Sequence, residues 1–154
     1  MVVGAANPAG RLPVTFYKGV EQLPPFTDYG MKGRTYRYFE GEPLFRFGFG
    51  FSSTFAYSGL SARRTAEGGE VRETVTNTSA RDGDEVVQLY VDGAPGEDAP
   101  RRSLRGFRRV HLRAGESQEV RFTVDPDALP ASTVVISVGG GQPVAGTACV
   151  KGRL

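Results

Sequence analysis

Few side chains in this sequence are of the types that catalyse reactions or hold metals. There is one histidine, His111, so a metal site built on two histidines of one chain is excluded. There is one cysteine, Cys149, which excludes an internal disulfide bond and leaves the redox compartment undecided. The glycine run 139–141 lacks the lysine and the following helix of a phosphate-binding loop, so it predicts a turn. We therefore expect no metal site and no cofactor.

Carboxylates are the remaining candidates for acid–base chemistry. They form three groups: Asp28, Glu40 and Glu42; Asp82, Asp84 and Glu85; and Asp125 with Asp127. The first group lies among aromatic residues, but its spacing does not indicate two carboxylates that face one pocket. The second lies at a polar turn, where carboxylates usually bond to the backbone or face solvent. The third flanks a proline, as a helix cap does. We therefore predict no catalytic residue in this chain.

The most suggestive cluster combines two arginines with two tyrosines: Arg34, Tyr36, Arg37 and Tyr38. As a rim of a sugar pocket, the aromatic faces would stack on sugar rings and the arginines would donate to hydroxyl groups. These four are the candidate substrate-binding residues. The same residue types also hold two domains together by packing and hydrogen bonds, and we favour this second interpretation.

Charge does not indicate a nucleic acid or a membrane as the partner. The chain has 154 residues, 19 basic and 17 acidic side chains and a formal net charge of +2. A basic run does occur: Arg101, Arg102, Arg105, Arg108 and Arg109. No recognition motif accompanies it, so we interpret it as a solvated edge strand that its charges protect. No run approaches the ~20 apolar residues of a membrane helix, and the first residues lack the basic and long apolar parts of a signal peptide.

The elements that would position these residues are β-strands. Residues Val71 to Val91 contain two arms in which apolar and polar residues alternate, as in a strand with one buried face. Between the arms, the polar run 77–84 favours a turn, so we expect a hairpin from which one sandwich is built. Similar patterns from Phe55 onward give about seven strands and no long amphipathic helix. The sequence therefore predicts a mainly β protein, an immunoglobulin-like or fibronectin type III-like β-sandwich.

Residues 1–52 do not follow this pattern. Prolines and glycines interrupt them, and short extended pieces are expected near 12–17 and 36–39. Phe45, Phe47, Phe49 and Phe51 would share one side of an extended chain. Four aromatic rings on one side need a large surface to pack on, and this segment does not supply one. We expect it to dock on the sandwich, on a further domain, or on both.

Several motifs, in order along the chain, resemble glycoside hydrolase family 3. NPAGRLPVTF at 7–16, MKGRTYRYF at 31–39 and GEPLF at 41–45 resemble the end of the α/β sandwich domain of that family. FGFGFS at 47–52 resembles the segment that leaves this domain. VTNT at 75–78 and GDEVVQLYV at 83–91 resemble the fibronectin type III-like domain that ends many members. The sequence at 36–44 is most similar to that of the β-xylosidase branch.

The resemblance implies a retaining β-glycosidase. In that family an aspartate nucleophile and a glutamate acid/base come from domains that would lie upstream of Met1. A retaining enzyme needs two carboxyl groups roughly 5–5.5 Å apart, and neither motif is present here, so the chain alone is predicted to be inactive. The implied partners are the upstream catalytic domains, and a β-glycoside would be bound only through the parent. The parent's compartment is left open, with periplasmic and secreted both considered.

Two departures from the family pattern affect the expected fold. Arg46 stands where a proline is usual, and Ser52-Ser53-Thr54 replaces the usual Ser-Tyr-Thr. The stretch 124–134 is short, so that one sheet could lack a strand.

The resemblance divides the chain into 1–52, the tail of the α/β domain with a linker, and 53–154, the fibronectin type III-like domain. It implies a non-catalytic structural region of a glycosidase, most similar to a β-xylosidase, which acts on β-linked xylosides or glucosides in plant polysaccharide breakdown. The alternative is a free-standing carbohydrate-binding or protein-interaction module.

Overall fold

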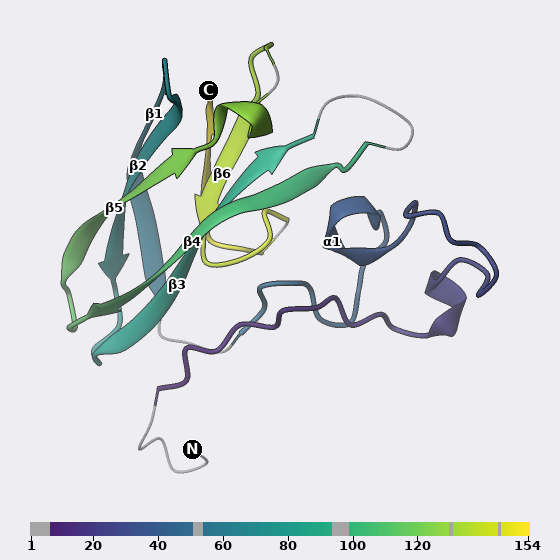
Figure 1. Cartoon of the computed structure of the whole chain (residues 1–154). Helices are drawn as coiled ribbons and strands as arrows, with labels where there is room; N and C mark the ends of the chain where they lie inside the picture. The colour runs from purple at the N-terminus through teal and green to yellow at the C-terminus, as the bar shows by residue number, and fades with distance from the viewer. Residues whose placement is uncertain (1–6, 51–53, 94–98, 130, 145) are drawn as a thin grey trace.

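The computed structural model describes residues 7–50, 54–93, 99–129, 131–144 and 146–154. Figure 1 shows a β-sandwich with an irregular N-terminal segment lying beside it. Seven strands occur in these residues: β1 (Phe55–Thr65), β2 (Gly68–Asn77), β3 (Gly83–Asp92), β4 (Arg102–Leu112), β5 (Ser117–Val124), β6 (Val135–Gly139) and β7 (Cys149–Arg153). The predicted class and strand number are therefore confirmed.

The strands form two antiparallel sheets that pack face to face. One sheet has the order β1-β2-β5 and the other has the order β4-β3-β6-β7. Alternate residues of each strand point into the space between the sheets, because side chains alternate across a pleated strand. The fully buried part of this core is aliphatic: Val71, Val75, Val87, Leu89, Leu112, Ile136 and Val138.

The stretch from Val71 to Val91 does form two strands, but they are not a hairpin. β2 belongs to the first sheet and β3 to the second, so the polar run between them crosses the sandwich. Asn77 directs this crossing: its side-chain amide donates to the carbonyls of Arg81 (2.8 Å) and Leu112 (3.0 Å). Period-two alternation shows that each arm has a buried face, but both arms of a crossing share that property with a hairpin.

The second sheet is buried on both of its faces along β3. Val87 and Leu89 point into the sandwich, while Gln88 and Tyr90 point the other way and are buried as well. The cover on that outer face is the N-terminal segment, which we define as residues 7–50. The sequence pattern did not separate this doubly buried strand from one with a solvated face.

The N-terminal segment contains little regular structure. Its elements are a 3-10 turn, η1 (Val20–Gln22), and a single helical turn, α1 (Thr35–Tyr38). The prediction of an extended piece at 36–39 is therefore wrong. Phe16 and Phe45 form one isolated antiparallel bridge in place of the strand expected at 12–17. The two ends of the segment thus lie side by side, and the middle extends away from the sandwich (Figure 1).

The short connection between β5 and β6 keeps both sheets intact. It contains one further 3-10 turn, η2 (Pro126–Ala128), which Asp125 caps by accepting from the amide of Asp127 at 2.9 Å. This confirms the cap predicted for the two aspartates. The described residues therefore contain the seven predicted strands with this short connection in place.

Candidate interdomain interface

The helical turn α1 places Tyr36 against the outer face of the sandwich. Its ring stacks on Phe47 with 4.2 Å between centroids, and it meets the edge of the Tyr90 ring at 6.1 Å. Its hydroxyl oxygen accepts a hydrogen bond from the amide of Leu104 at 3.0 Å. This amide belongs to β4, an edge strand, so Tyr36 takes the place of a missing neighbouring strand.

Arg37 joins α1 to the same strand. Its guanidinium donates to the hydroxyl of the buried Ser103 at 3.1 Å, and its carbonyl accepts from the amide of Arg101 at 2.8 Å. The guanidinium also lies 5.7 Å from the centre of the Tyr38 ring, within the range of a cation–π contact. Arg37 and Tyr36 therefore attach the N-terminal segment to one edge of the second sheet.

The side-chain hydrogen bonds described for Arg34 stay within the N-terminal segment and do not reach the sandwich. Its guanidinium donates to the carbonyls of Gly30 (2.9 Å), Pro25 (3.4 Å) and Asp28. These bonds close the loop 25–34 on itself. The four candidate substrate-binding residues are thus divided between two tasks, and their role toward a substrate stays a prediction.

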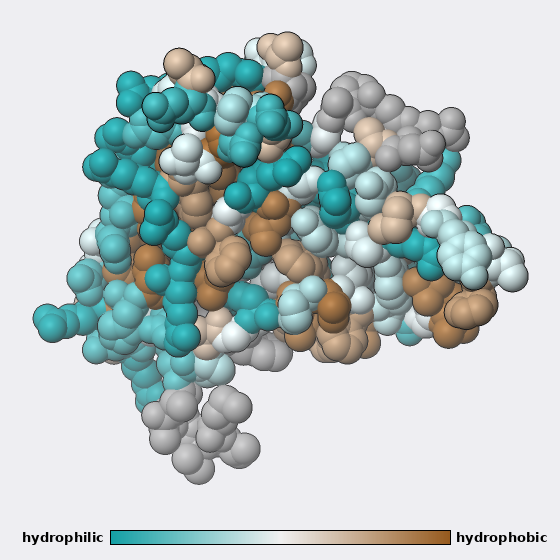
Figure 2. Space-filling view, in the orientation of Figure 1, coloured by the Kyte–Doolittle hydropathy of each residue, from teal (hydrophilic) through white to brown (hydrophobic). Residues whose placement is uncertain are grey.

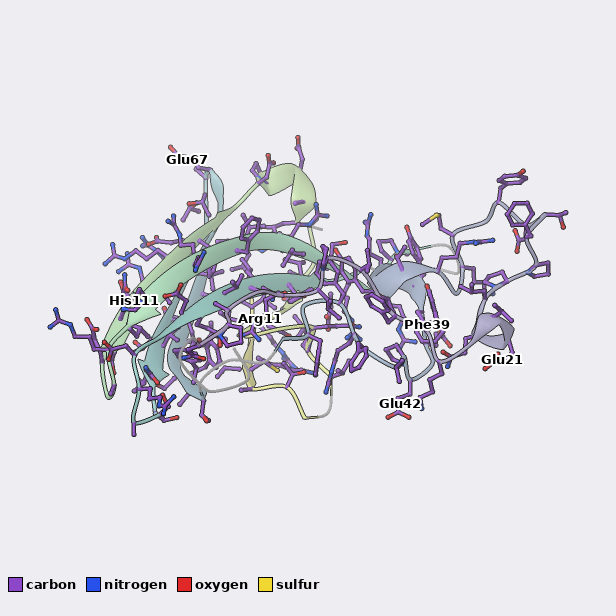
Figure 3. All side chains as sticks on the ribbon, turned by 90° about the horizontal axis from the view of Figure 1, so that it is seen from below. Arg11, Glu21, Phe39, Glu42, Glu67 and His111 are labelled. Atoms are coloured by element: carbon purple, nitrogen blue, oxygen red, sulfur yellow. The ribbon has the colours of Figure 1, made fainter. Side chains whose placement is uncertain are left out.

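A buried ion pair attaches the beginning of the segment to β3. Arg11 donates to Glu85 through its guanidinium, and both side chains are almost completely enclosed. Glu85 also accepts from the amide of Val86 at 2.7 Å. The expectation that Glu85 would face solvent or serve only the backbone is therefore wrong. Figure 3 shows Arg11 among the strands of the sandwich, far from Glu21 and Glu42 on the outer part of the segment.

The surroundings of Glu85 shift two ionisations. Burial raises the pKa of the Glu85 carboxyl, and the nearby Arg11 opposes this shift without reversing it. Burial, followed by the charge of Glu85, also raises the pKa of the Tyr57 hydroxyl. Tyr57 therefore stays protonated, and its hydroxyl cannot act as a base at neutral pH. The sequence did not predict the contact of Arg11 with Glu85. A single arginine in a turn-rich stretch has no periodicity from which its burial could be inferred.

The two ends of the segment meet at a glycine that approaches the sandwich closely. Gly48 has a φ of +75°, and its amide donates to the carbonyl of Leu12 at 2.8 Å. A Cβ atom at this position would lie 2.7 Å from Oε1 of Gln88 and 3.2 Å from the Cα of Gly141. Only glycine, which has no Cβ atom, allows the backbone to approach the sandwich this closely.

The predicted row of phenylalanines on one side of an extended chain is wrong. A turn closes at this point, with the amide of Phe49 donating to the carbonyl of Arg46 at 3.0 Å. The turn sends Phe47 toward Tyr36, while Phe45 and Phe49 pack on each other at 5.2 Å between centroids. The fourth predicted member, Phe51, lies outside the described residues.

Arg46 supplies a further contact that the sequence pattern did not predict. Its guanidinium donates to the hydroxyl of Thr147 at 3.0 Å, across 101 positions of the chain. A cavity of about 360 Å³ lies beside this contact, and its polar lining includes Arg11, Arg46, Tyr57 and Glu85. A second cavity of about 480 Å³ lies between α1 and the loop 39–46. Both follow the seam between the segment and the sandwich.

The carboxylates considered as catalysts make contacts of a structural kind. Asp28 accepts from the amide of Gly30 (2.8 Å), and Asp82 accepts from the amide of Ala114 (3.0 Å). The acidic residues among the aromatics pair with surface cations: Glu40 with Arg101 (3.0 Å) and Glu42 with Lys18 (2.7 Å). The pKa of Glu42 is lowered by its hydrogen bond to Lys18, which favours the charged form. This is the opposite of the raised pKa that a general acid requires.

Asp84 and the residues around it form a surface network on β3 and β4. Asp84 contacts Arg109 and His111, with 2.5 Å between Nδ1 of His111 and Oδ1 of Asp84. These contacts lower the pKa of the Asp84 carboxyl. Because β4 is an edge of its sheet, the arrangement agrees with the interpretation of the basic run as a charged edge strand.

Burial raises the pKa of the Cys149 thiol, which makes it a poor nucleophile.

The N-terminal segment carries most of the exposed large apolar side chains among the described residues. Figure 2 shows hydrophobic side chains gathered along the lower edge of this segment, while the sandwich surface is mostly hydrophilic. Phe26 and Tyr29 are 94% and 91% exposed. We call the following set the apolar face: Val14, Phe16, Val20, Leu23, Phe26, Tyr29, Met31, Leu44 and Phe45. A shallow hollow of about 630 Å³ lies at one end of it, between Leu12, Phe16 and Phe49.

The part of the chain that the structure describes contains neither a metal-binding cluster nor a membrane-spanning helix. No group of three or more His, Cys, Asp or Glu side chains there could hold a metal ion. No helix there is long and apolar enough to cross a membrane.

Known protein families and curated sequences give consistent matches. Residues 85–135 match the fibronectin type III-like domain family. A xylan 1,4-β-xylosidase from Xylanibacter ruminicola is 41% identical over 132 residues, which is 84% of this chain and 15% of the relative. A periplasmic β-glucosidase from Salmonella typhimurium is 35% identical over 147 residues, which is 84% of this chain and 19% of the relative. The chain therefore spans less than a fifth of the length of these two relatives.

Solved structures match over almost the whole chain. The β-glucosidase 3B from Thermotoga neapolitana, in complex with glucose, superposes with a TM-score of 0.86 and 28% identity; the match covers 99% of this chain and 25% of that one. The family 3 β-glucosidase from Bifidobacterium adolescentis gives 0.81 and 30% identity, covering 98% and 27%. In sequence and in fold, therefore, the chain is similar to the C-terminal part of β-xylosidases and β-glucosidases of glycoside hydrolase family 3.

Proposed function

We propose that this chain is the non-catalytic structural region of a retaining β-glycosidase, and that its sandwich holds the last segment of the catalytic domains in place. One observation carries this proposal. The N-terminal segment is attached to the sandwich by Arg11, Tyr36 and Arg37, and it also exposes the apolar face. Nine large apolar side chains on one segment of a soluble domain mark a surface that a partner covers.

The partner we propose for the apolar face is the remainder of the parent enzyme. On this proposal residues 1–52 are the tail of an α/β domain with a linker, and residues 53–154 are the fibronectin type III-like domain. Substrate would be bound and cleaved only in the parent. The match to a xylan 1,4-β-xylosidase supports β-linked xylosides in plant polysaccharides as the substrates of the parent. The matches to β-glucosidases support β-linked glucosides as the alternative.

The first experiment measures whether the purified chain cleaves chromogenic aryl β-xylosides or β-glucosides. We expect no release of the leaving group above a mock purification from cells that lack the gene. The reason is that the candidate carboxylates Asp28, Glu40, Glu42 and Glu85 are engaged in backbone, surface or buried ion-pair contacts. Activity that co-purifies with the chain would overturn the proposal.

A second experiment tests the partner. The xylosidase from Xylanibacter ruminicola would be produced without the part that matches this chain, and the two polypeptides would be co-expressed. We expect this chain to raise the soluble yield and thermal stability of the truncated enzyme. The matched control replaces Phe16 and Phe45 of the apolar face by serine and should lose the effect. Equal rescue by both forms would contradict the proposed docking.

A further inference from the structure

Glu73 is a carboxylate on the inward face of β2, the central strand of its sheet. It lies in phase with Val71 and Val75, and it is paired across the sheet with Val120 of β5. These three valines belong to the buried core. Glu73 is fully buried with them, although charged side chains are rarely buried without a partner.

The carboxylate has no adequate hydrogen-bond partner. Neither of its oxygens accepts a hydrogen bond from the described residues. The backbone amide of Ser58 on β1 favours the charged form, but it does not reach the carboxylate with hydrogen-bond geometry. An ionised carboxylate in such a place loses its hydration without compensation, which is costly. Burial accordingly raises the pKa of Glu73 to about 7 from its ordinary 4.5.

The charged groups of the neighbouring strands do not neutralise Glu73. From β1 it is faced by Tyr57, whose own pKa it helps to raise. From β3 the inward-facing carboxylate is Glu85, which is already paired with Arg11. From β5 the charged side chains alternate onto the outer face and pair with each other there, as Glu119 and Arg121 do at 2.5 Å. From β6 and β7 the inward-facing side chains are apolar: Ile136, Val138 and Val150.

The strand opposite Glu73 is interrupted at the same level. On β1, Ser58 pairs with Thr74 and Ser61 pairs with Arg72, so the register breaks where Glu73 lies between them. Gly59 in the break has a φ of +73°. Such a bulge interrupts the hydrogen-bond ladder, and β1 is an edge of its sheet. Opening this edge would let water reach the carboxylate.

We propose that Glu73 makes the sandwich sensitive to protons: its protonated side chain keeps β1 closed on β2, and its ionisation loosens this edge. The direction in which stability changes with pH follows from the difference between the folded and unfolded pKa of Glu73. The folded state holds the proton more tightly than the unfolded state, so stability is greatest in acid. Stability falls as the pH rises above the unfolded value of 4.5 and levels off above the folded value of about 7.

The test compares urea unfolding of the full chain at pH 5 and pH 8. With these two pKa values, Glu73 alone should lower the folding equilibrium constant of the wild type by roughly 70-fold between the two pH values. Glu73→Gln replaces the protonated carboxyl by a neutral amide of the same shape, and it should remove most of this fall. Glu70→Gln is the matched control, because it removes a carboxylate from the outer face of the same strand, where arginines lower its pKa. It should keep the fall unchanged.

Infrared difference spectra between pH 6 and pH 8 test the titration directly in the native protein. The wild type should lose a protonated carboxyl band that Glu73→Gln lacks and Glu70→Gln retains. Should Glu73→Gln fail to fold, hydrogen exchange on the wild type decides: β1–β2 amides should lose protection relative to β3–β4 amides as the pH rises. The inference is wrong if the wild type keeps one stability from pH 5 to pH 8, or if Glu73→Gln shows the same fall as the wild type.

Discussion

Replacing Arg11 by methionine should destabilise the chain strongly, and more strongly in base than in acid. Methionine preserves the apolar stem of the side chain and removes the charge. Glu85 then remains as a buried carboxylate without its cation. The side chains of Arg11 and Glu85 are only 11% and 4% exposed, so solvent does little to screen this loss.

The size of the effect follows from this enclosure. Removing one partner of a buried ion pair costs about 3–5 kcal/mol, because the other charge is left uncompensated. Burial already holds the pKa of Glu85 above its ordinary value, and Arg11 opposes that shift. Without Arg11 the pKa rises further, so the carboxyl can protonate as the pH falls. The cost of Arg11→Met should therefore be full near pH 8 and smaller near pH 5.

The assay is urea unfolding followed by circular dichroism, with the wild type measured at each pH so that other titrations cancel. The double variant Arg11→Met with Glu85→Gln should regain a large part of the loss at pH 8, because no buried charge then lacks a partner. A loss below about 1 kcal/mol at pH 8 would refute the buried pair, since surface pairs have that size. No recovery in the double variant would also refute it.

Three further predictions concern the seam and the core. Gly48→Ala should cost about 1–3 kcal/mol more than Gly115→Ala by urea unfolding, because both glycines have a φ of +75° but only Gly48 has atoms within 4 Å of a new Cβ; equal costs would contradict close approach. Tyr36→Phe should cost about 1–3 kcal/mol, since an amide of β4 loses its acceptor; a neutral result would mean that water replaces the hydroxyl. Hydrogen exchange should be slow in Val86–Val91 and fast in 27–32; equal protection would place both in one cooperative unit.

The sequence was sufficient for the class and the strands but not for how two strands connect. Alternation at Val71–Val75 and Val87–Val91 marks an inward face in each arm, and those faces are buried as expected. The partner of each strand is a separate matter, because alternation is a property of one strand alone. Whether the turn between them stays in one sheet or crosses depends on the side chain of Asn77, which bonds forward to Arg81 and across to Leu112.

The inward orientation of Glu73 follows from its spacing in the sequence. Its position, two residues from Val71 and two from Val75, places it on the inward face by the same rule that predicted the core. A carboxylate in phase with two buried valines is therefore detectable from the sequence. Its lack of a partner is not, because that depends on which groups β1, β3 and β5 bring to the same depth.

The interface was predicted as residue types but not as contacts. The Arg34–Tyr38 cluster was recognised as a means of joining domains, and Tyr36 and Arg37 do contact the sandwich. The pair Arg11–Glu85 and the contact Arg46–Thr147 join positions 74 and 101 residues apart. One sequence without aligned relatives contains no information on such distant pairs.

The contact between Arg46 and Thr147 has a consequence for synthesis on the ribosome. The N-terminal segment emerges before the sandwich, and Thr147 is made 101 residues after Arg46. Ribosomes add about 5–20 residues per second, so the segment waits roughly 5–20 s before this part of its seat exists. During that interval the rings that later face the sandwich, Tyr36 and Phe47, are open to other nascent chains. Slower elongation of the last strands should lengthen this interval and increase aggregation, and a chaperone that binds aromatic segments should counteract it.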